Sequence, residues 1–251
     1  MAKLLLKKSY RHNDLKEVKF NDLWNGHGIF TTMRVIGRSP KLLFYKTHID
    51  NLVKSLNKYN IRKKNLRKNI RKLIKLNLKK NKNYDHLLRV ASNNKLISIS
   101  LRKRPIPKSN FKLKMVNYKR IDAQYKNLKY KKILKILSRL DVTKYDIALY
   151  KKNKIFETGT SNLLFVKNNK IFSASKDCYK GSTIKFFCKK IKIKFTNIFT
   201  ESIKSFDEIL VVGSGKGVIS VSSIDKNIWK RKSLKMFYKL LKIYKYEIKN
   251  N

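Results

Sequence analysis

Residues 154–166 read KIFETGTSNLLFV, in which two apolar runs flank a group of turn-forming residues. Runs of this kind, rich in β-branched and aromatic residues, predict two strands joined by a tight turn. Glu157 ends the first run and is one of 15 acidic residues in the chain. A single glutamate at the end of a strand is usually exposed to solvent, so the local pattern alone assigns it no role.

The second half of the chain, around this stretch, alternates strands with helices. We expect at least three strands within residues 145–175, separated by turns rich in lysine and asparagine. The apolar spacing predicts helices over residues 130–140, 183–191 and 232–244. A strand over 207–212 runs into the turn Gly-Ser-Gly-Lys-Gly at 213–217.

The first half shows a similar mixture. Residues 25–35, NGHGIFTTMRV, predict a glycine-rich turn that leads into a strand, and a short strand is expected at 42–45. Helices are predicted over 48–61 and 62–83, followed by a hairpin that turns at Asn93-Asn94. The first twenty residues have no clear periodicity. We therefore predict an α+β fold with two domains, residues 1–117 and 118–251, each with its own sheet.

Composition supports a folded core. The chain has 251 residues, of which 42% are hydrophobic and 11% aromatic, so extensive disorder is not expected. No run of eighteen apolar residues is present, and the N-terminal apolar stretch is too short for a secretion signal. Two cysteines, Cys178 and Cys188, are too few to stabilise a chain of this size, which favours a cytoplasmic location.

The charge is extreme, with 63 lysines and arginines against 15 acids and a formal net charge of +48. Such a balance raises the alternative of a non-enzymatic nucleic-acid-binding protein. However, 51 of the basic residues are lysines spread from end to end, and alanine occurs only five times. A binding surface favours clustered arginine and interleaved aromatics. We therefore favour compositional drift toward lysine, with only non-specific binding to nucleic acid.

Three further features are ambiguous when each is taken alone. The turn at 213–218, GSGKGV, follows an apolar strand but lacks the full spacing of a dinucleotide-binding fingerprint. Residues 181–183, GST, open a helix and are compatible with a phosphate site or with an ordinary helix start. Lys126 is one of 51 lysines and has no compositional distinction.

The order and spacing of these features resemble the class IV aminotransferase family, the fold-type IV pyridoxal-phosphate enzymes. The resemblance covers roughly residues 20–225 and is strongest from 145 to 221. The family's glycine turn and following strand correspond to Gly26, Gly28, Phe30, Thr31, Thr32, Met33, Arg34 and Val35. Its most specific signature, a glutamate followed by Asn-Leu-Phe, corresponds to residues 157–165, from Glu157 to Phe165. The resemblance implies two domains, each a mainly antiparallel sheet or pseudo-barrel with flanking helices.

The resemblance also implies a cofactor, pyridoxal 5'-phosphate, and residues that hold it. Lys126 matches the Schiff-base lysine, which must be partly deprotonated although a free lysine has a pKa of about 10.4. Tyr130 is kept beside it, whereas Lys129 replaces an asparagine. Glu157 matches the carboxylate that keeps the pyridine nitrogen protonated. The phosphate-binding residues correspond to Ser182, Thr183, Gly213, Ser214 and Gly215. We identify no set of metal ligands.

One position departs from the family pattern. The family motif His-x-x-Arg-Leu reads His48-Ile49-Asp50-Asn51-Leu52, so Asn51 replaces the arginine that pairs with the cofactor phosphate. Loss of one charge-assisted contact costs about 1.5–3 kcal/mol. Two alternatives stay open: a nearby lysine takes over the contact, or the cofactor is bound weakly.

Three activities of the family compete. The chain is short for a branched-chain aminotransferase, and Thr31 stands where the aminotransferases usually carry glutamate. We therefore favour aminodeoxychorismate lyase, which converts 4-amino-4-deoxychorismate to 4-aminobenzoate and pyruvate on the way to folate. A branched-chain or D-amino-acid aminotransferase is the alternative. The resemblance implies a small-molecule amino substrate and a homodimer, with a site assembled between the domains and against the second subunit.

Overall fold

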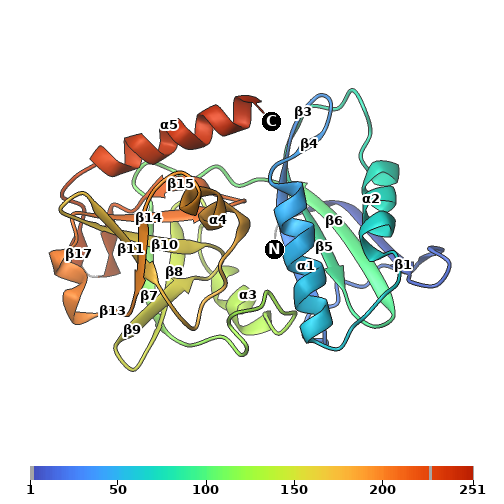
Figure 1. Ribbon diagram of the computed structural model, residues 1–251, viewed down its shortest axis with the longest axis horizontal. Helices are drawn as coiled ribbons and strands as arrows, with labels where there is room; N and C mark the ends of the chain where they lie inside the picture. Colours follow the sequence, from blue (N-terminus) through green and yellow to red (C-terminus); the bar gives the residue numbers. More distant parts are fainter. Residues whose placement is uncertain (1–2, 226–227, 251) are drawn as a thin grey trace. The chain divides into compact units, whose positions relative to one another are not determined.

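The structure, a computed structural model, describes residues 3–225 and 228–250 (Figure 1). It consists of two compact units. The first contains the chain up to Arg104 together with Tyr125–Lys132, and the second contains Pro105–Gln124 and the chain from Ile133 onward. No helix among the described residues is both long enough and apolar enough to cross a membrane.

This division differs from the expected boundary after residue 117, because the chain passes between the units three times. Tyr125–Lys132, which includes Lys126, belongs to the first unit. The backbone N–H of Phe30 donates to the Lys126 carbonyl at 2.9 Å, and Asn127 forms a β-bridge with Ile29. Backbone pairing across about a hundred residues thus decides the placement, and local composition does not reveal it.

The first unit is built on one sheet whose strands all pair antiparallel, in the order β2-β1-β6-β5-β3-β4. Two helices, α1 (Tyr45–Lys58) and α2 (Leu66–Asn77), accompany it in Figure 1. The strands are β1 (Leu4–Arg11), β2 (Glu17–Val18), β3 (Ile29–Gly37), β4 (Lys41–Leu42), β5 (Tyr84–Ser92) and β6 (Leu96–Lys103).

One face of this sheet is buried against the two helices. Alternate residues along β3, such as Met33 and Val35, point to the same face and join the core. They meet apolar residues of α1 and α2 at helical spacing, including Leu52, Leu56 and Ile70. The charged positions between them lie on the outer face of the helices, so amphipathic spacing accounts for both helices despite the excess of lysine.

The second unit contains two sheets, one of five strands in the order β12-β11-β10-β14-β15 and one of six in the order β13-β9-β8-β7-β16-β17. Three pairs are parallel (β11 with β12, β7 with β8, β7 with β16), so both sheets are mixed. The strands are β7 (Lys112–Asn117), β8 (Tyr145–Lys151), β9 (Lys154–Thr158), β10 (Asn162–Lys167), β11 (Lys170–Ala174), β12 (Ile193–Thr196), β13 (Ile198–Phe199), β14 (Glu208–Gly213), β15 (Gly217–Ser220), β16 (Ser223–Ile224) and β17 (Trp229–Lys230).

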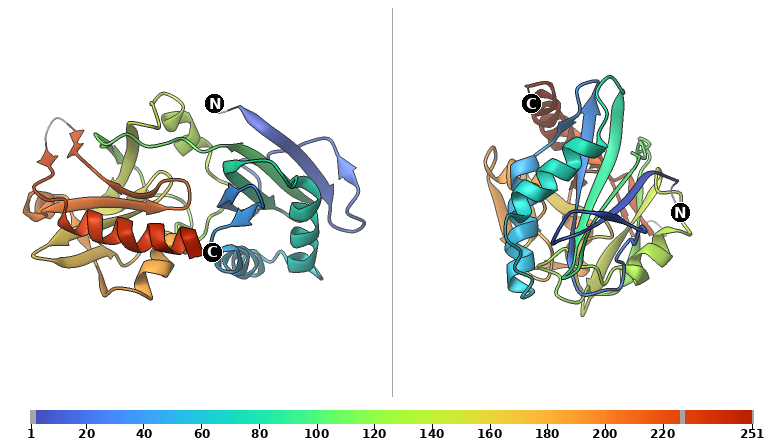
Figure 2. Two further views of the ribbon diagram at one scale, coloured as in Figure 1. Left: turned by 90° about the horizontal axis from the view of Figure 1, so that it is seen from above. Right: turned by 90° about the vertical axis from the view of Figure 1, so that its right-hand side faces the viewer.

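The core of this unit lies between the two sheets. It contains Leu163 and Phe165 of β10 with Val211 of β14, and it meets Leu113 of β7 and Ile155 of β9. The helices of this part of the chain are α3 (Lys131–Leu137), α4 (Ser182–Cys188), a short 3-10 helix η1 (Glu201–Ser205) and α5 (Lys235–Asn250). Helix α4 packs on β14, and α5 lies along β15 (Figure 2).

The sequence-based prediction of an α+β fold is confirmed, and so is the hairpin of β5 and β6. Its turn forms because the side chain of Asn93 accepts hydrogen bonds from the backbone of Lys95 and Leu96, both at 2.8 Å. The expectation of mainly antiparallel sheets is confirmed as well: every strand pair of the first unit is antiparallel, and so are six of the nine pairs of the second. Strands β1 and β7 were not predicted, because their lysines mask the alternation that pairing with β6 and β8 imposes.

Candidate functional site

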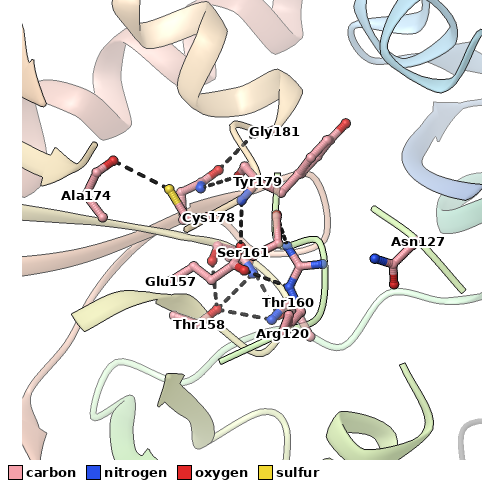
Figure 3. Close-up of polar contacts among 12 residues, drawn as sticks. Arg120, Asn127, Glu157, Thr158, Thr160, Ser161, Ala174, Cys178, Tyr179 and Gly181 are labelled. Carbon is pink, nitrogen blue, oxygen red and sulfur yellow. Dashed lines mark hydrogen bonds and ion pairs between the residues drawn. The ribbon is translucent and has the colours of Figure 1, made fainter. Parts of the chain in front are cut away.

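Glu157 lies at the end of β9 and is not an exposed strand end. Its side chain is 7% exposed and that of Arg120 is 2% exposed, and the Arg120 Nε donates to the Glu157 Oε1 at 2.7 Å (Figure 3). The same guanidinium donates to the Ala123 carbonyl at 2.6 Å. A cation in contact with a buried carboxyl favours its charged form. Glu157 is therefore a buried carboxylate held in a defined orientation.

Glu157 also faces the segment that leads into α4. The second carboxylate oxygen accepts a hydrogen bond from the Tyr179 backbone N–H at 3.2 Å. Asn162, five residues after Glu157, donates to the Tyr179 carbonyl at 2.6 Å and accepts from the Gly181 N–H at 3.1 Å. Glu157 and Asn162, both part of the signature, thus fix the segment at the start of α4.

Cys178 is adjacent to this carboxylate but is not a candidate nucleophile. Burial raises the pKa of its thiol to about 12, and the charge of Glu157 acts in the same direction. The thiol donates weakly to the Ala174 carbonyl at 3.5 Å. A thiol that stays protonated at physiological pH is inert as a nucleophile.

The start of α4 has unused hydrogen-bonding groups. Ser182 and Thr183 are 3% and 1% exposed, and within residues 3–225 and 228–250 neither hydroxyl oxygen has a hydrogen-bond partner. Among the described residues no side chain caps the helix, so the first backbone N–H groups also point out of its N-terminus. Two buried hydroxyls beside a helix N-terminus match the needs of an anionic group with several acceptor oxygens.

The turn after β14 lies close to the same region. Val212 pairs with Asn162 across β10 and β14, and Asn162 holds Gly181, so both phosphate-site candidates adjoin one residue. Gly213 is required here, because an added Cβ would collide with the Ser161 hydroxyl. Ser214 and Gly215 are half-buried in the turn that follows. The second unit therefore brings Glu157, the α4 hydroxyls and the glycine turn into one neighbourhood.

Lys126 and Tyr130 lie in the first unit. The Lys126 Nζ is 5.1 Å from the centre of the Phe30 ring, and the Tyr130 ring packs edge-on against the same ring at 5.3 Å. Trp24 completes the cluster, with its ring centre 4.8 Å from that of Phe30. Strand β3 and the segment 125–132 thus place Lys126 beside aromatic side chains.

Asn51 is buried on α1, one turn after His48. His48 is hydrogen-bonded to Thr31 at 2.7 Å between Nδ1 and Oγ1. Burial, and to a smaller extent the positive charge of Lys126, lower the pKa of His48 to about 3. His48 is therefore neutral at physiological pH and adds no second cation near Lys126.

Arg120 is a candidate site residue that the sequence analysis missed, and Asn162 was noted there only as part of the signature, without a role. A usable signal exists for Arg120, because only 12 arginines remain in a chain with 51 lysines. The planar guanidinium of an arginine is suited to a fixed, hydrogen-bonded pair with a carboxylate. For Asn162 the signal is its place in the signature, whereas composition gives none, since asparagine is abundant throughout this chain.

Comparison with known proteins agrees with the signature. The sequence profile of the family described as amino-transferase class IV matches residues 28–224. No curated protein matches the chain by sequence. The profile covers both units, including Lys126, Glu157, the α4 start and the glycine turn.

Several solved structures have a similar fold. A branched-chain aminotransferase from Thermoproteus uzoniensis with norvaline is 15% identical, with 95% of this chain and 93% of that chain covered and a TM-score of 0.79. A protein assigned as a 4-amino-4-deoxychorismate lyase from Legionella pneumophila is 19% identical, covers 94% and 97%, and has a TM-score of 0.73. An aminotransferase from Brucella abortus bound to pyridoxal phosphate is 15% identical, covers 98% and 99%, and has a TM-score of 0.75. At these identities the likeness concerns the fold.

Proposed function

Because the chain belongs to the class IV aminotransferase family, we propose that it binds pyridoxal 5'-phosphate and acts on a small amino substrate. Within the family we propose a lyase that converts 4-amino-4-deoxychorismate to 4-aminobenzoate and pyruvate. The observation that carries the cofactor proposal is the pair of unpartnered, buried hydroxyls at the start of α4, among the described residues. The family assignment favours an enzyme over the nucleic-acid-binding alternative.

The residues of the second unit fit the polar ends of this cofactor. Among the described residues the buried hydroxyls of Ser182 and Thr183 have no hydrogen-bond partner, so they are available to donate to phosphate oxygens. A phosphate group offers several acceptor oxygens, and charge-assisted hydrogen bonds to them are stronger than those to a neutral acceptor such as water. We propose that Gly213, Ser214 and Gly215 form the second side of this phosphate site.

When bound, pyridoxal phosphate supplies an aldehyde that links to amines and a cationic ring that withdraws electrons from the adjacent carbon. We propose that Glu157 holds the proton on the ring nitrogen. Arg120, at 2.7 Å, keeps Glu157 charged and oriented, and so acts as a positioning residue. A neutral side chain at position 157 would leave the ring nitrogen without a fixed anionic partner.

We propose that Lys126 carries the covalent link to the cofactor and moves the proton in the reaction. Its Nζ would take the proton from the substrate carbon that bears the amino group, and the enolpyruvyl group would then leave. The ring of the product becomes aromatic, which drives the step, and the proton passes to the leaving group to give pyruvate. The Phe30 ring lies beside this lysine, and Tyr130 packs against the same ring.

The preference for a lyase over an aminotransferase depends on Thr31. A threonine has no carboxylate, so this position lacks the acid that the aminotransferases usually carry. Thr31 is 1% exposed, and its hydroxyl is hydrogen-bonded to the neutral ring of His48. An aminotransferase with a branched-chain or D-amino-acid substrate is the second candidate, because solved aminotransferases share the fold. The two differ in whether a 2-oxo acid is needed to accept the amino group.

Asn51 remains the departure from the family pattern. It is buried on α1 and has no charge, so it cannot form the bidentate contact that an arginine makes with phosphate. We propose that a lysine replaces this contact.

We also propose that the chain acts as a cytoplasmic homodimer. Light scattering of the purified protein tests the dimer.

The cofactor proposal is tested by reduction with borohydride after incubation with pyridoxal phosphate, followed by peptide mass spectrometry. The modification is expected on Lys126 and absent in Lys126→Ala. Lys129→Ala removes an exposed lysine three residues away and is expected to keep the modification. Modification of another lysine in the unaltered protein would contradict the assignment of Lys126.

The substrate proposal is tested with 4-amino-4-deoxychorismate in the absence of any 2-oxo acid. Release of 4-aminobenzoate and pyruvate in equal amounts supports the lyase. Amino transfer from branched-chain or D-amino acids that depends strictly on a 2-oxo acid, without 4-aminobenzoate formation, would instead establish an aminotransferase.

A further inference from the structure

Lys216 has surroundings unlike those of a solvated lysine. It lies in the turn between β14 and β15, where its backbone N–H donates to the Gly213 carbonyl at 3.2 Å. Its side chain is 8% exposed, and its Nζ is 3.0 Å from the Oδ2 of Asp146, a residue with no exposed side-chain surface. The turn proposed to bind phosphate is thus tied by a buried ion pair to β8.

Thr160 closes this contact into a triangle. The Lys216 Nζ donates to the Thr160 Oγ1 at 2.8 Å, and the Thr160 hydroxyl donates to the Asp146 Oδ2 at 2.8 Å. The other carboxylate oxygen of Asp146 accepts from the Ile147 backbone N–H at 2.8 Å. Thr160 belongs to the turn that directly follows Glu157 and Thr158, so the triangle joins that turn to the turn after β14.

The packing of the two turns agrees with this link. Gly213 approaches Ser161 so closely that no Cβ fits at position 213. Gly217 has a φ of +72° and marks the other end of the turn, where an added Cβ would lie 2.9 Å from the Tyr244 ring. The turn is therefore held at both ends by close contacts and in the middle by the Lys216 side chain.

We propose that Lys216 is a positioning residue of the phosphate site: its ammonium group pairs with Asp146 and Thr160 and thereby holds residues 213–215, and it does not itself bind the phosphate. This inference deepens the proposed function and rests on it. The charge of Lys216 is used inside the protein, in its contacts with Asp146 and Thr160.

The test compares Lys216→Met, Lys216→Arg and Asp146→Asn by titration with pyridoxal phosphate and with pyridoxal, which lacks the phosphate. In Lys216→Met the affinity for pyridoxal phosphate falls by about tenfold or more, the value of one charge-assisted contact, whereas pyridoxal affinity changes by less than about twofold. Lys216→Arg keeps a cation and recovers part of the loss. Lys170→Met removes an exposed lysine of the same unit and serves as the control.

Asp146→Asn separates positioning from direct binding. If Lys216 positions the turn, loss of its partner lowers the affinity for pyridoxal phosphate. If Lys216 binds the phosphate directly, the same variant frees its charge and raises that affinity, which overturns the proposal.

Hydrogen exchange without cofactor gives a second readout. The amides of residues 213–218 exchange at least about tenfold faster in Lys216→Met than in the unaltered protein, because the turn opens more easily. If the amides of residues 213–218 exchange in Lys216→Met as they do in the unaltered protein, the proposal is overturned. This outcome is decisive even when the variant keeps its fold and its melting temperature. If the unaltered protein binds neither pyridoxal phosphate nor pyridoxal, the proposed function fails while hydrogen exchange still decides whether Lys216 holds the turn.

Discussion

At the scale of single residues, buried charge separates structural and functional positions from a basic surface. Arg120, Asp146, Glu157 and Glu208 are all buried, and each has a polar partner within hydrogen-bond distance. Most charged side chains of this chain are solvated and contribute little individually. The buried ones are where substitution has large effects, because a charge left without its partner in the interior is costly.

Arg120→Met is expected to destabilise the protein by about 3–5 kcal/mol, because it leaves the buried carboxylate of Glu157 without its cation. Urea denaturation measures the change. Arg139→Met removes an exposed arginine of the same unit and should stay within about 0.5 kcal/mol of the unaltered protein. Equal stability of both variants would show that Arg120 does not neutralise Glu157.

His48 predicts a dependence of stability on pH. The pKa of His48 is about 3 in the folded protein and 6.5 in the unfolded chain. At pH values between these two, only the unfolded chain carries a proton on this imidazole. The contribution of the neutral, buried His48 to the free energy of unfolding is complete above pH 6.5 and is lost as the pH falls toward 3. Between pH 7 and pH 4.5 it amounts to about 2–3 kcal/mol.

Urea denaturation at both pH values measures this difference in the free energy of unfolding. His48→Gln is expected to show a smaller difference than the unaltered protein, because glutamine takes up no proton. His27→Gln changes an exposed histidine of the same unit and should leave the difference unchanged. An undiminished difference in His48→Gln would assign the pH dependence to other groups.

At the scale of elements, helix ends are fixed by side chains from distant strands. The carboxylate of Glu208, at the start of β14, accepts hydrogen bonds from the backbone N–H groups of Met236 and Phe237 at 2.7 and 2.8 Å. An anion at a helix N-terminus is favourable because it compensates the helix dipole and the unpaired N–H groups. α5 therefore begins where β14 supplies an acceptor, and its buried Tyr244 then reaches Gly217.

Glu208→Gln is expected to cost about 1–2 kcal/mol, because an uncharged amide places N–H groups against N–H donors and no longer compensates the helix dipole. The free energy of opening of the α5 amides, measured by hydrogen exchange, should fall by a similar amount. Glu201→Gln, at an exposed carboxylate that accepts one hydrogen bond from Asn153, is the control and should change little. Unaltered exchange along α5 would contradict the capping role.

At the scale of the whole molecule, the net charge of +48 acts through the surface and leaves the cores apolar. Lysine side chains can cover apolar surface while their ammonium groups remain in water. The fold therefore tolerates a composition that would otherwise suggest a nucleic-acid-binding protein. What this charge does predict is a general attraction to polyanions.

Binding to duplex DNA is expected to be insensitive to sequence and to weaken by about tenfold or more between about 50 mM and 200 mM salt, since counterion release drives it. Fluorescence anisotropy with two unrelated duplexes of equal length measures both properties, with polyglutamate as a competitor of a different chemical class. A preference for one duplex that persists at the higher salt would restore the nucleic-acid-binding hypothesis.

Local sequence by itself determined the elements with clear periodicity. The spacing of Ile49, Leu52 and Leu56 indicates α1, and the Asn93 turn indicates the β5–β6 hairpin, because both signals arise within a few residues. The order of the signature motifs likewise indicated the α+β fold and the family. Helix ends were less well predicted: α1 begins at Tyr45, three residues before the predicted start, directly after Phe44, which adopts a left-handed conformation.

Only the tertiary structure decided which residues meet. Glu157 and Arg120 are 37 positions apart, and Asp146 and Lys216 are 70 apart, so neither partner predicts the other locally. In a chain with 51 lysines, composition cannot distinguish Lys216 from a solvated neighbour. Strand pairing between β8 and β9 and between β10 and β14 brings these groups together and excludes water from them. Burial, which gives each ion pair its strength and its cost, is a property of that packing and not of any segment alone.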